Sequence, residues 1–157
     1  MVPVDSRDLA ILSVLTREGR ITKAELAEHA GLGSTACADR LARLEREGVV
    51  AGYRAQIALK TLGPHLEVFV TVELKNHNAA AFQTFERAVA QERVIVQCWA
   101  LGGGLDYLMH IVCRDVDAYQ RFMDHLLDRR IGLSRYFTYI VTKTVKEAPV
   151  DLAQLLA

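Results

Sequence analysis

The sequence predicts an α+β protein with two domains joined by an extended hinge. Apolar residues follow helical spacing up to about residue 47, strand-like and helical segments alternate from residue 66 onward, and Gly63-Pro64 separates the two regions. A chain of 157 residues can bury a core in each of two small domains. We expect a three-helix domain at 1–54, a hinge strand or linker at 55–64, an α+β domain at 65–147 and a C-terminal tail at 148–157.

Three helices are predicted in the first region. The segment 5–17 carries a broad apolar stripe, and Thr22 followed by Glu25 forms a capping box at the start of the second helix. Gly31 can adopt a positive φ where the second helix ends, and the third helix is expected at 34–47. Two short helices joined by a tight turn predict a helix-turn-helix, the motif that places its second helix in the major groove of DNA.

The third helix has an apolar side and a side free to contact DNA. At 100° per residue, Cys37, Leu41 and Leu44 fall together, and they must pack on the first two helices. Thr35, Asp39, Ala42, Arg43 and Arg46 fall on the opposite side, which with the N-terminal Ser34, Thr35 and Ala38 is free to enter a major groove. We narrow the groove face to Ser34, Thr35, Ala38, Asp39 and Arg43. The alternative is a solvated face on which Arg40, Arg43 and Arg46 form pairs such as Asp39 with Arg43.

The second region predicts a β-α-β-β-α-β order, the ferredoxin-like arrangement. Its two helices should cover one face of an antiparallel sheet, and a second subunit would naturally cover the other face. The expected strands are 66–75, 94–101, 107–113 and 134–145, the expected helices are 79–91 and 115–128, and an extended stretch is expected at 49–59.

Composition fits a cytoplasmic folded protein, with no membrane span or signal peptide expected. Formal net charge is zero, and residues 1–54 hold eight basic and eight acidic side chains. Attraction of one subunit to DNA phosphates should therefore be weak, so DNA binding would need several subunits. The three cysteines are expected to be reduced core thiols, the scattered histidines lack metal-ligand spacing, and no cofactor motif is present.

The glycine turn at 102–104, followed by Asp106, suits a small zwitterion. Glycines allow close approach to backbone amides, which can bind a carboxylate, while Asp106 can accept from an ammonium group. The alternative is a plain β-hairpin in which the glycines satisfy turn geometry and Asp106 caps a backbone amide.

The predicted helix-turn-helix and the predicted ferredoxin-like region both resemble the Lrp/AsnC family (leucine-responsive and asparagine regulators) of transcription factors. The resemblance covers nearly the whole chain, and the order and spacing of its pieces make it specific. The segments that match the family pattern are DSRDLAIL at 5–12, LARLEREGVV at 41–50 with Gly52-Tyr53, Gly103 with Asp106-Tyr107-Leu108, and Thr138-Tyr139-Ile140-Val141 ending at Val145-Lys146.

The resemblance implies a regulator of amino-acid metabolism that binds double-stranded DNA. It implies homodimers that assemble into tetramers or octamers, and a small effector, commonly an amino acid, bound between subunits. The implied DNA-binding residues are Ser34, Thr35, Ala38, Asp39, Arg40 and Arg43; the implied effector-binding residues are Gly102, Gly103, Gly104, Asp106, Leu108, Thr138, Tyr139 and Ile140.

Some residues depart from the family pattern. Gly33, Ser34 and Ala36 stand where the family often has Ser, Pro and Pro, and Asp39 stands where it often has a basic residue. An acid in the groove can accept from a cytosine amino group but repels phosphate, which bears on the operator sequence. The turn also lacks the acidic residue that often precedes the residue equivalent to Asp106.

Two other functions are compatible with parts of the sequence. A protein-interaction adaptor, or a small-molecule-binding domain without DNA binding, would explain the neutral charge and Asp39. An enzyme would use Asp106, His110 or Tyr107 as acid-base groups, but Asp106 and His110 lie four residues apart on a strand, about 13 Å. That separation is too long for a paired nucleophile and base, so we expect no catalytic site.

Overall fold

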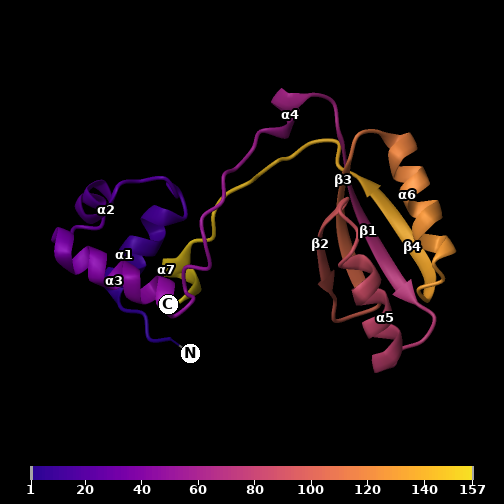
Figure 1. Ribbon diagram of the computed structural model, residues 1–157, viewed down its shortest axis with the longest axis horizontal. Helices are drawn as coiled ribbons and strands as arrows, with labels where there is room; N and C mark the ends of the chain where they lie inside the picture. Colours follow the sequence, from indigo (N-terminus) through magenta and orange to yellow (C-terminus); the bar gives the residue numbers. More distant parts are fainter. Residues whose placement is uncertain (1, 157) are drawn as a thin grey trace. The chain divides into compact units, whose positions relative to one another are not determined.

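The structure is a computed structural model that describes residues 2–156 in two compact units. The first unit consists of Met1–Ile57 with Lys146–Ala157, and the second of Ala58–Val145. The chain thus leaves the first unit after residue 57 and returns to it at residue 146 (Figure 1). The described residues 148–156, part of the segment that we expected to form a separate tail, therefore belong to the helical unit.

The first unit contains the three expected helices. They are α1 (Ser6–Leu15), α2 (Lys23–His29) and α3 (Ser34–Arg46). The predicted capping box of α2 is confirmed, since the Thr22 hydroxyl accepts from the Glu25 amide and the Glu25 carboxylate accepts from the Thr22 amide. Gly31 has φ +66 at the turn between α2 and α3, a conformation that glycine adopts without strain.

A small apolar core holds these helices together. It comprises Ile11, Leu12, Val14, Leu26, Ala27, Cys37, Leu41 and Leu44. Cys37, Leu41 and Leu44 are the buried residues of α3, as the helical wheel predicted, so the opposite side of α3 is left for other contacts.

The expected extended hinge is partly helical. Leu59–Leu62 form the one-turn helix α4, in which the Thr61 amide and hydroxyl both donate to the carbonyl of Ala58. Gly63, with φ +144, ends the turn before Pro64. The described residues 48–58 form no strand, because no neighbouring segment pairs with them, and the Val49 and Val50 amides instead bond back to the Leu44 carbonyl.

The second unit has the predicted β-α-β-β-α-β order. Its elements are β1 (Leu66–Leu74), α5 (Ala79–Val89), β2 (Ile95–Ala100), β3 (Tyr107–Cys113), α6 (Val116–Asp128) and β4 (Leu133–Ile140). The strands form one antiparallel sheet in the order β2-β3-β1-β4, the ferredoxin-like topology. Strand β4 ends five residues earlier than expected, because its pairing with β1 ends where Val68 meets Ile140.

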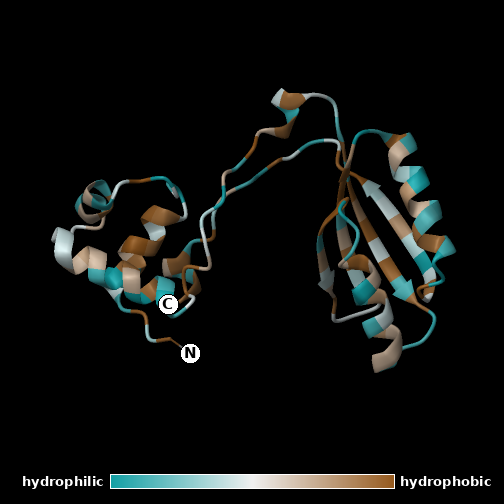
Figure 2. Ribbon diagram, in the orientation of Figure 1, coloured by the Kyte–Doolittle hydropathy of each residue, from teal (hydrophilic) through white to brown (hydrophobic). Residues whose placement is uncertain are grey.

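Both helices pack on one face of the sheet. Alternate residues of β1, namely Val68, Val70, Val72 and Leu74, are buried with residues of β3, α5 and α6 in one core. Hydrophobic and hydrophilic residues alternate along α5 and α6, as expected for amphipathic helices (Figure 2). No helix in residues 2–156 is long and apolar enough to cross a membrane.

Helix α7 (Leu152–Leu155) completes the first unit. A four-residue helix is not stable alone, so it depends on its cap and on packing. The Asp151 side chain accepts from the Ala153 and Gln154 amides at 3.1 and 3.2 Å, and Leu152 packs against the core of the first unit. The outgoing and returning segments are also joined, since the Gln56 amide donates to Glu147 at 2.9 Å.

Candidate DNA-binding surface and effector turn

The outward side of α3 is the candidate DNA-binding surface. Ser34, Thr35 and Asp39 are exposed and Ala38 is half-buried, so these predicted residues share one accessible face. Gly33 caps α3 without a side-chain hydrogen bond, which leaves the first amides of the helix without that partner. Free amides at a helix N-terminus favour a phosphate group.

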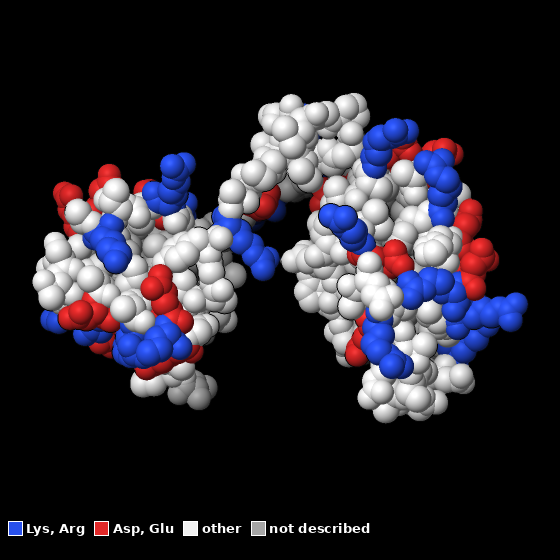
Figure 3. Space-filling view, in the orientation of Figure 1, with Lys and Arg blue, Asp and Glu red and all other residues white. Residues whose placement is uncertain are grey.

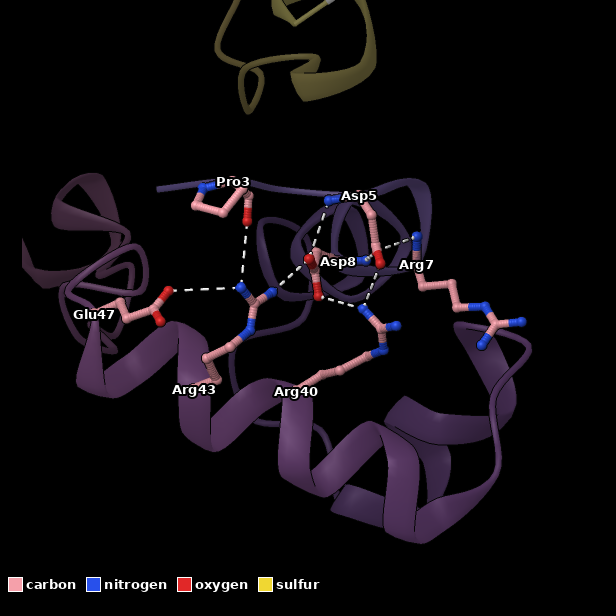
Figure 4. A network of polar contacts seen from close by, with 7 residues as sticks. All are labelled: Pro3, Asp5, Arg7, Asp8, Arg40, Arg43 and Glu47. Atoms are coloured by element: carbon pink, nitrogen blue, oxygen red, sulfur yellow. Dashed lines mark hydrogen bonds and ion pairs between the residues drawn. The ribbon is translucent and has the colours of Figure 1, made fainter. Parts of the chain in front are cut away.

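Arg40 and Arg43, also predicted to contact DNA, point toward the N-terminus of α1 instead (Figure 4). Arg40 donates to Asp5 at 2.7 Å and to Asp8 at 2.9 Å. Arg43 donates to the other oxygen of Asp8 at 2.5 Å and to the Pro3 carbonyl at 3.2 Å. We call Asp5, Asp8, Arg40 and Arg43 the N-terminal ion network; it pairs two arginines with two carboxylates.

Asp8 lies at the centre of this network. Its side chain is 1% exposed, and it accepts hydrogen bonds from the Asp5 amide and from both arginines. Burial favours the neutral acid, but these hydrogen bonds outweigh it, so the pKa of Asp8 is lowered. The Asp8 amide and Arg40 lower the pKa of Asp5 to about 2, and both carboxylates raise the pKa of Arg40.

Arg46, which the helical wheel placed on the free side of α3, was not among the predicted DNA-binding residues. It is exposed and forms no ion pair among the described residues. Its wheel position lies within about 20° of Thr35, so Arg46 shares the accessible face of α3. Acidic and basic side chains are interspersed on the visible face of this unit, in keeping with the equal numbers of acidic and basic residues at 1–54 (Figure 3).

The glycine turn forms a tight connection between β2 and β3. The Leu101 amide donates to the Asp106 carbonyl at 2.8 Å, which closes the turn around Gly102, Gly103 and Gly104. Gly103 has φ +149, a conformation that favours glycine, and a Cβ on any of the three would meet no atom within 4 Å. The turn therefore leaves open space beside its backbone.

Asp106 joins this turn to the end of β1. Its Oδ2 accepts from the Leu74 amide at 2.7 Å and lies 3.1 Å from His77 Nε2. These contacts match the hairpin alternative, in which Asp106 caps a backbone amide. They leave Oδ1 without a hydrogen bond among the described residues. Sequence spacing gave no signal for His77, which lies 29 residues away.

Within one chain, the predicted effector residues do not form a single cluster. Asp106 lies beside Val72 and Leu74 near the end of β1, whereas Ile140 pairs with Val68 near its start. Strand β1 also lies between β3 and β4. The remaining members divide between the two faces: Thr138 contacts Tyr119 of α6 on the helix side, while Leu108 and Tyr139 lie on the open side.

The open side of the sheet carries aromatic residues with no helix over them. Phe69, Trp99, Phe137 and Tyr139 lie on this side, and the last three are between 39% and 55% exposed. At its centre, the Thr71 hydroxyl is buried and has no hydrogen-bond partner among the described residues. An open sheet face with exposed aromatic residues and an unsatisfied polar group is typical of a protein interface.

The acid-base groups of the enzyme alternative have separate partners. His110 Nε2 lies 2.7 Å from Glu67, and the Tyr107 hydroxyl donates to Glu86 at 2.8 Å. Asp106 bonds Leu74 and His77, so none of the three bonds another. Within residues 2–156, no group of three or more His, Cys, Asp or Glu side chains is placed to hold a metal ion. Of the three free cysteines, Cys37 is buried as expected but Cys98 is exposed.

Comparisons with known proteins assign both units. Residues 4–51 match the model of a winged helix-turn-helix DNA-binding domain, and residues 67–151 match that of the Lrp/AsnC ligand-binding domain. The chain is 44% identical over 150 residues to the transcriptional regulatory protein DoeX of Halomonas elongata, covering 96% of this chain and 95% of the relative. It is 34% identical over 145 residues to the leucine-responsive regulatory protein of Escherichia coli K12, covering 92% and 88%.

Solved structures share the fold over nearly the whole length. The Neisseria meningitidis transcriptional regulator NMB0573, in complex with L-Met, superposes with a TM-score of 0.89 at 29% identity and covers 98% of this chain and 99% of its own. Escherichia coli AsnC, at 21% identity, matches with a TM-score of 0.84 over 96% and 99%, which supports the fold alone.

Together these features define a transcription regulator that combines a helix-turn-helix with a ligand-binding domain. The chain belongs to the Lrp/AsnC family.

Proposed function

We propose that this regulator binds operator DNA as a homo-oligomer and that an amino acid or related metabolite changes its affinity. The similarity to NMB0573, described in complex with L-Met, carries the effector proposal, because it extends over 98% of the chain. The leucine-responsive relative points to the same class of ligand. The exposed backbone and free Asp106 Oδ1 at the glycine turn supply donors and an acceptor for such a zwitterion.

The open face of the sheet supports a homodimer. Its aromatic residues and the unpaired Thr71 hydroxyl would be covered by the same face of a second copy, as an isologous interface requires. Assembly into tetramers or octamers would bring residues of the glycine turn near β4 of a neighbour. That arrangement would unite the effector residues that one chain keeps apart.

Oligomerisation would also compensate for the lack of net positive charge on the helix-turn-helix. One helix-turn-helix unit, here called a head, attracts phosphate weakly because residues 1–54 hold eight basic and eight acidic residues. In an oligomer, binding of one head to DNA holds the second head close to its own site, which raises its effective concentration there. We assign the DNA contacts to Ser34, Thr35, Ala38, Asp39 and Arg46. We also propose that the protein is cytoplasmic. The contacts of Arg40 and Arg43 depend on the N-terminal ion network.

An effector that favours one assembly state would change operator affinity, since coupling requires different affinities in the two states. Isothermal titration with the twenty amino acids, Leu and Met first, tests the ligand, and gel shifts with genomic fragments test its effect on DNA. Absence of heat with every amino acid and related metabolite would overturn the effector proposal. Absence of binding to any fragment would favour the alternative, an adaptor without DNA binding.

Arg46→Ala tests the revised DNA surface. The exposed guanidinium forms no ion pair among residues 2–156, so we expect an unchanged melting temperature. Loss of its contact with DNA should weaken operator binding by about fivefold per helix-turn-helix. Gel shifts at matched salt measure the effect, and Arg17→Ala, in the loop after α1, is the charge-matched control. Equal affinities for wild type and Arg46→Ala would remove Arg46 from the surface.

A further inference from the structure

The two carboxylates of the N-terminal ion network are placed differently. Asp8 is 1% exposed and bonds both arginines, so it is a fixed part of the domain. The Asp5 side chain is 53% exposed, and its contact with Arg40 lies at the surface. Only Asp5 can therefore be replaced without opening the core.

The two oxygens of Asp5 also serve different groups. Oδ1 accepts from the Arg7 and Asp8 amides, both at 2.9 Å, and so caps α1. Oδ2 accepts from Arg40 at 2.7 Å (Figure 4). Arg40 can leave Oδ2 while the cap on α1 remains intact.

An open cavity gives access to this contact. It has a volume of about 630 Å³ and is lined by residues from the start of the chain and from α3, including Asp5, Arg40 and Arg43. Asp39, which belongs to the exposed face of α3, lines the same cavity. The cavity thus joins the candidate DNA-binding surface to the ion network.

We propose that Asp5 is an exchangeable internal ligand of Arg40, which a DNA phosphate replaces when the helix-turn-helix binds. Arginine binds carboxylate and phosphate through the same planar donors, so the exchange keeps the guanidinium paired. Asp8 continues to hold Arg40 by its second contact and positions it. Asp5 thereby competes with DNA and lowers the affinity of each head. The inference rests on the proposed DNA binding and names a regulatory contact within it.

Asp5→Asn is the direct test. Asparagine is a good helix cap, so Oδ1 can still accept from the two amides, while the new amide group no longer accepts from Arg40. We expect the full-length variant to bind a 40-base-pair duplex of random sequence about fivefold more tightly per head. The slope of log affinity against log salt should change by much less than the roughly 0.9 of one phosphate contact, because Arg40 contacts the same phosphate in both complexes.

A double-mutant cycle separates exchange from simple loss of negative charge. In the Arg40→Gln background, Asp5→Asn should give no gain, because the residue released by the change is absent. Asp39→Asn is the matched control: it removes a neighbouring carboxylate that repels phosphate but does not bond Arg40. It should therefore also tighten binding to a duplex of random sequence, and this gain should persist in the same background. If Arg40→Gln does not fold, Arg40→Lys replaces it, and the gain should then shrink.

Each outcome has one meaning. A gain from Asp5→Asn that persists without Arg40 overturns the exchange, as does an unchanged affinity of Asp5→Asn. Wild-type protein that binds no duplex even at low salt overturns the proposed function and, with it, this inference. Wild-type binding with a persistent gain overturns the inference alone.

Discussion

Protonation of Asp5 links the stability of the helix-turn-helix to pH. Its pKa in the folded chain is about 2, below the ordinary value of 3.8, because the Asp8 amide and Arg40 favour the carboxylate. A lowered pKa means that the ionised group stabilises the fold above about pH 3.8, and that this contribution is lost as the pH falls toward 2. Asp8, with its lowered pKa, contributes in the same direction.

Removal of Arg40 should raise the pKa of Asp5. In Arg40→Gln the Asp8 amide still donates to Asp5, so we expect a titration midpoint between about 2 and 3.8. Carboxyl chemical shifts measured against pH by NMR report this value directly. An unchanged midpoint would show that the pairing of Asp5 with Arg40 does not exist in solution.

These residues also show where sequence reasoning ends. The helical wheel identified the buried residues Cys37, Leu41 and Leu44, because apolar periodicity depends on one helix alone. It could not show that Arg40 and Arg43 turn toward Asp5 and Asp8, since those contacts span 32 to 35 residues. Pairing with distant residues decides which charges of a helix remain free.

At the scale of elements, the order of strands and helices along the chain was predictable, whereas the residues at which they end were not. Alternation and turn signals gave the β-α-β-β-α-β order, while the end of β4 depends on where its pairing with β1 stops. Residues 55–64 were predicted to be extended, but hydrogen bonds from the Thr61 amide and hydroxyl to the Ala58 carbonyl favour the one-turn helix α4 there. The position of α7 in the first unit needed tertiary contacts from Leu152.

The glycine turn can be tested by its backbone geometry. Gly103→Ala should destabilise the second unit by roughly 1–3 kcal/mol, because a Cβ disfavours φ +149. Gly104→Ala is the control, since Gly104 is not at positive φ and its added Cβ would meet nothing within 4 Å. Urea unfolding measures both variants. Equal stabilities would contradict the strained geometry at Gly103.

Helix α7 should stabilise the helix-turn-helix unit. Leu152→Ala removes partly buried apolar surface from the core that contains α1, so we expect a loss of about 1 kcal/mol. Leu155 is 67% exposed, and Leu155→Ala should leave stability unchanged. Thermal unfolding of the full chain distinguishes them. If both variants melt like wild type, α7 does not contribute to that core.

At the scale of the whole molecule, the two units divide the work of regulation. The helix-turn-helix supplies a DNA-binding unit with no net charge at residues 1–54, and the ligand-binding unit supplies an open aromatic sheet face, which we propose as the interface between copies. The sequence predicted this division because an amphipathic sheet with helices on one side leaves the other side open. Only the structure identifies the buried hydroxyl of Thr71 on that face, which has no hydrogen-bond partner among residues 2–156.

Tyr139→Arg should separate the copies. Tyr139 is 55% exposed in the single chain, so its replacement leaves the fold intact but places a charge in the proposed apolar interface. We expect self-association to weaken at least about tenfold, as measured by sedimentation velocity. Val116→Arg is the control, because Val116 is 60% exposed and begins α6, which packs on the opposite face of the sheet.

Binding to DNA should change along with association. A duplex with two half-sites should lose the affinity gained by tethering when Tyr139→Arg dissociates the dimer, whereas a duplex with one half-site should bind both proteins equally. Because Tyr139 is also a predicted effector residue, the measurement is made without amino acids. A dissociated variant that keeps full affinity for two half-sites would contradict the view that weakly charged heads depend on the oligomer.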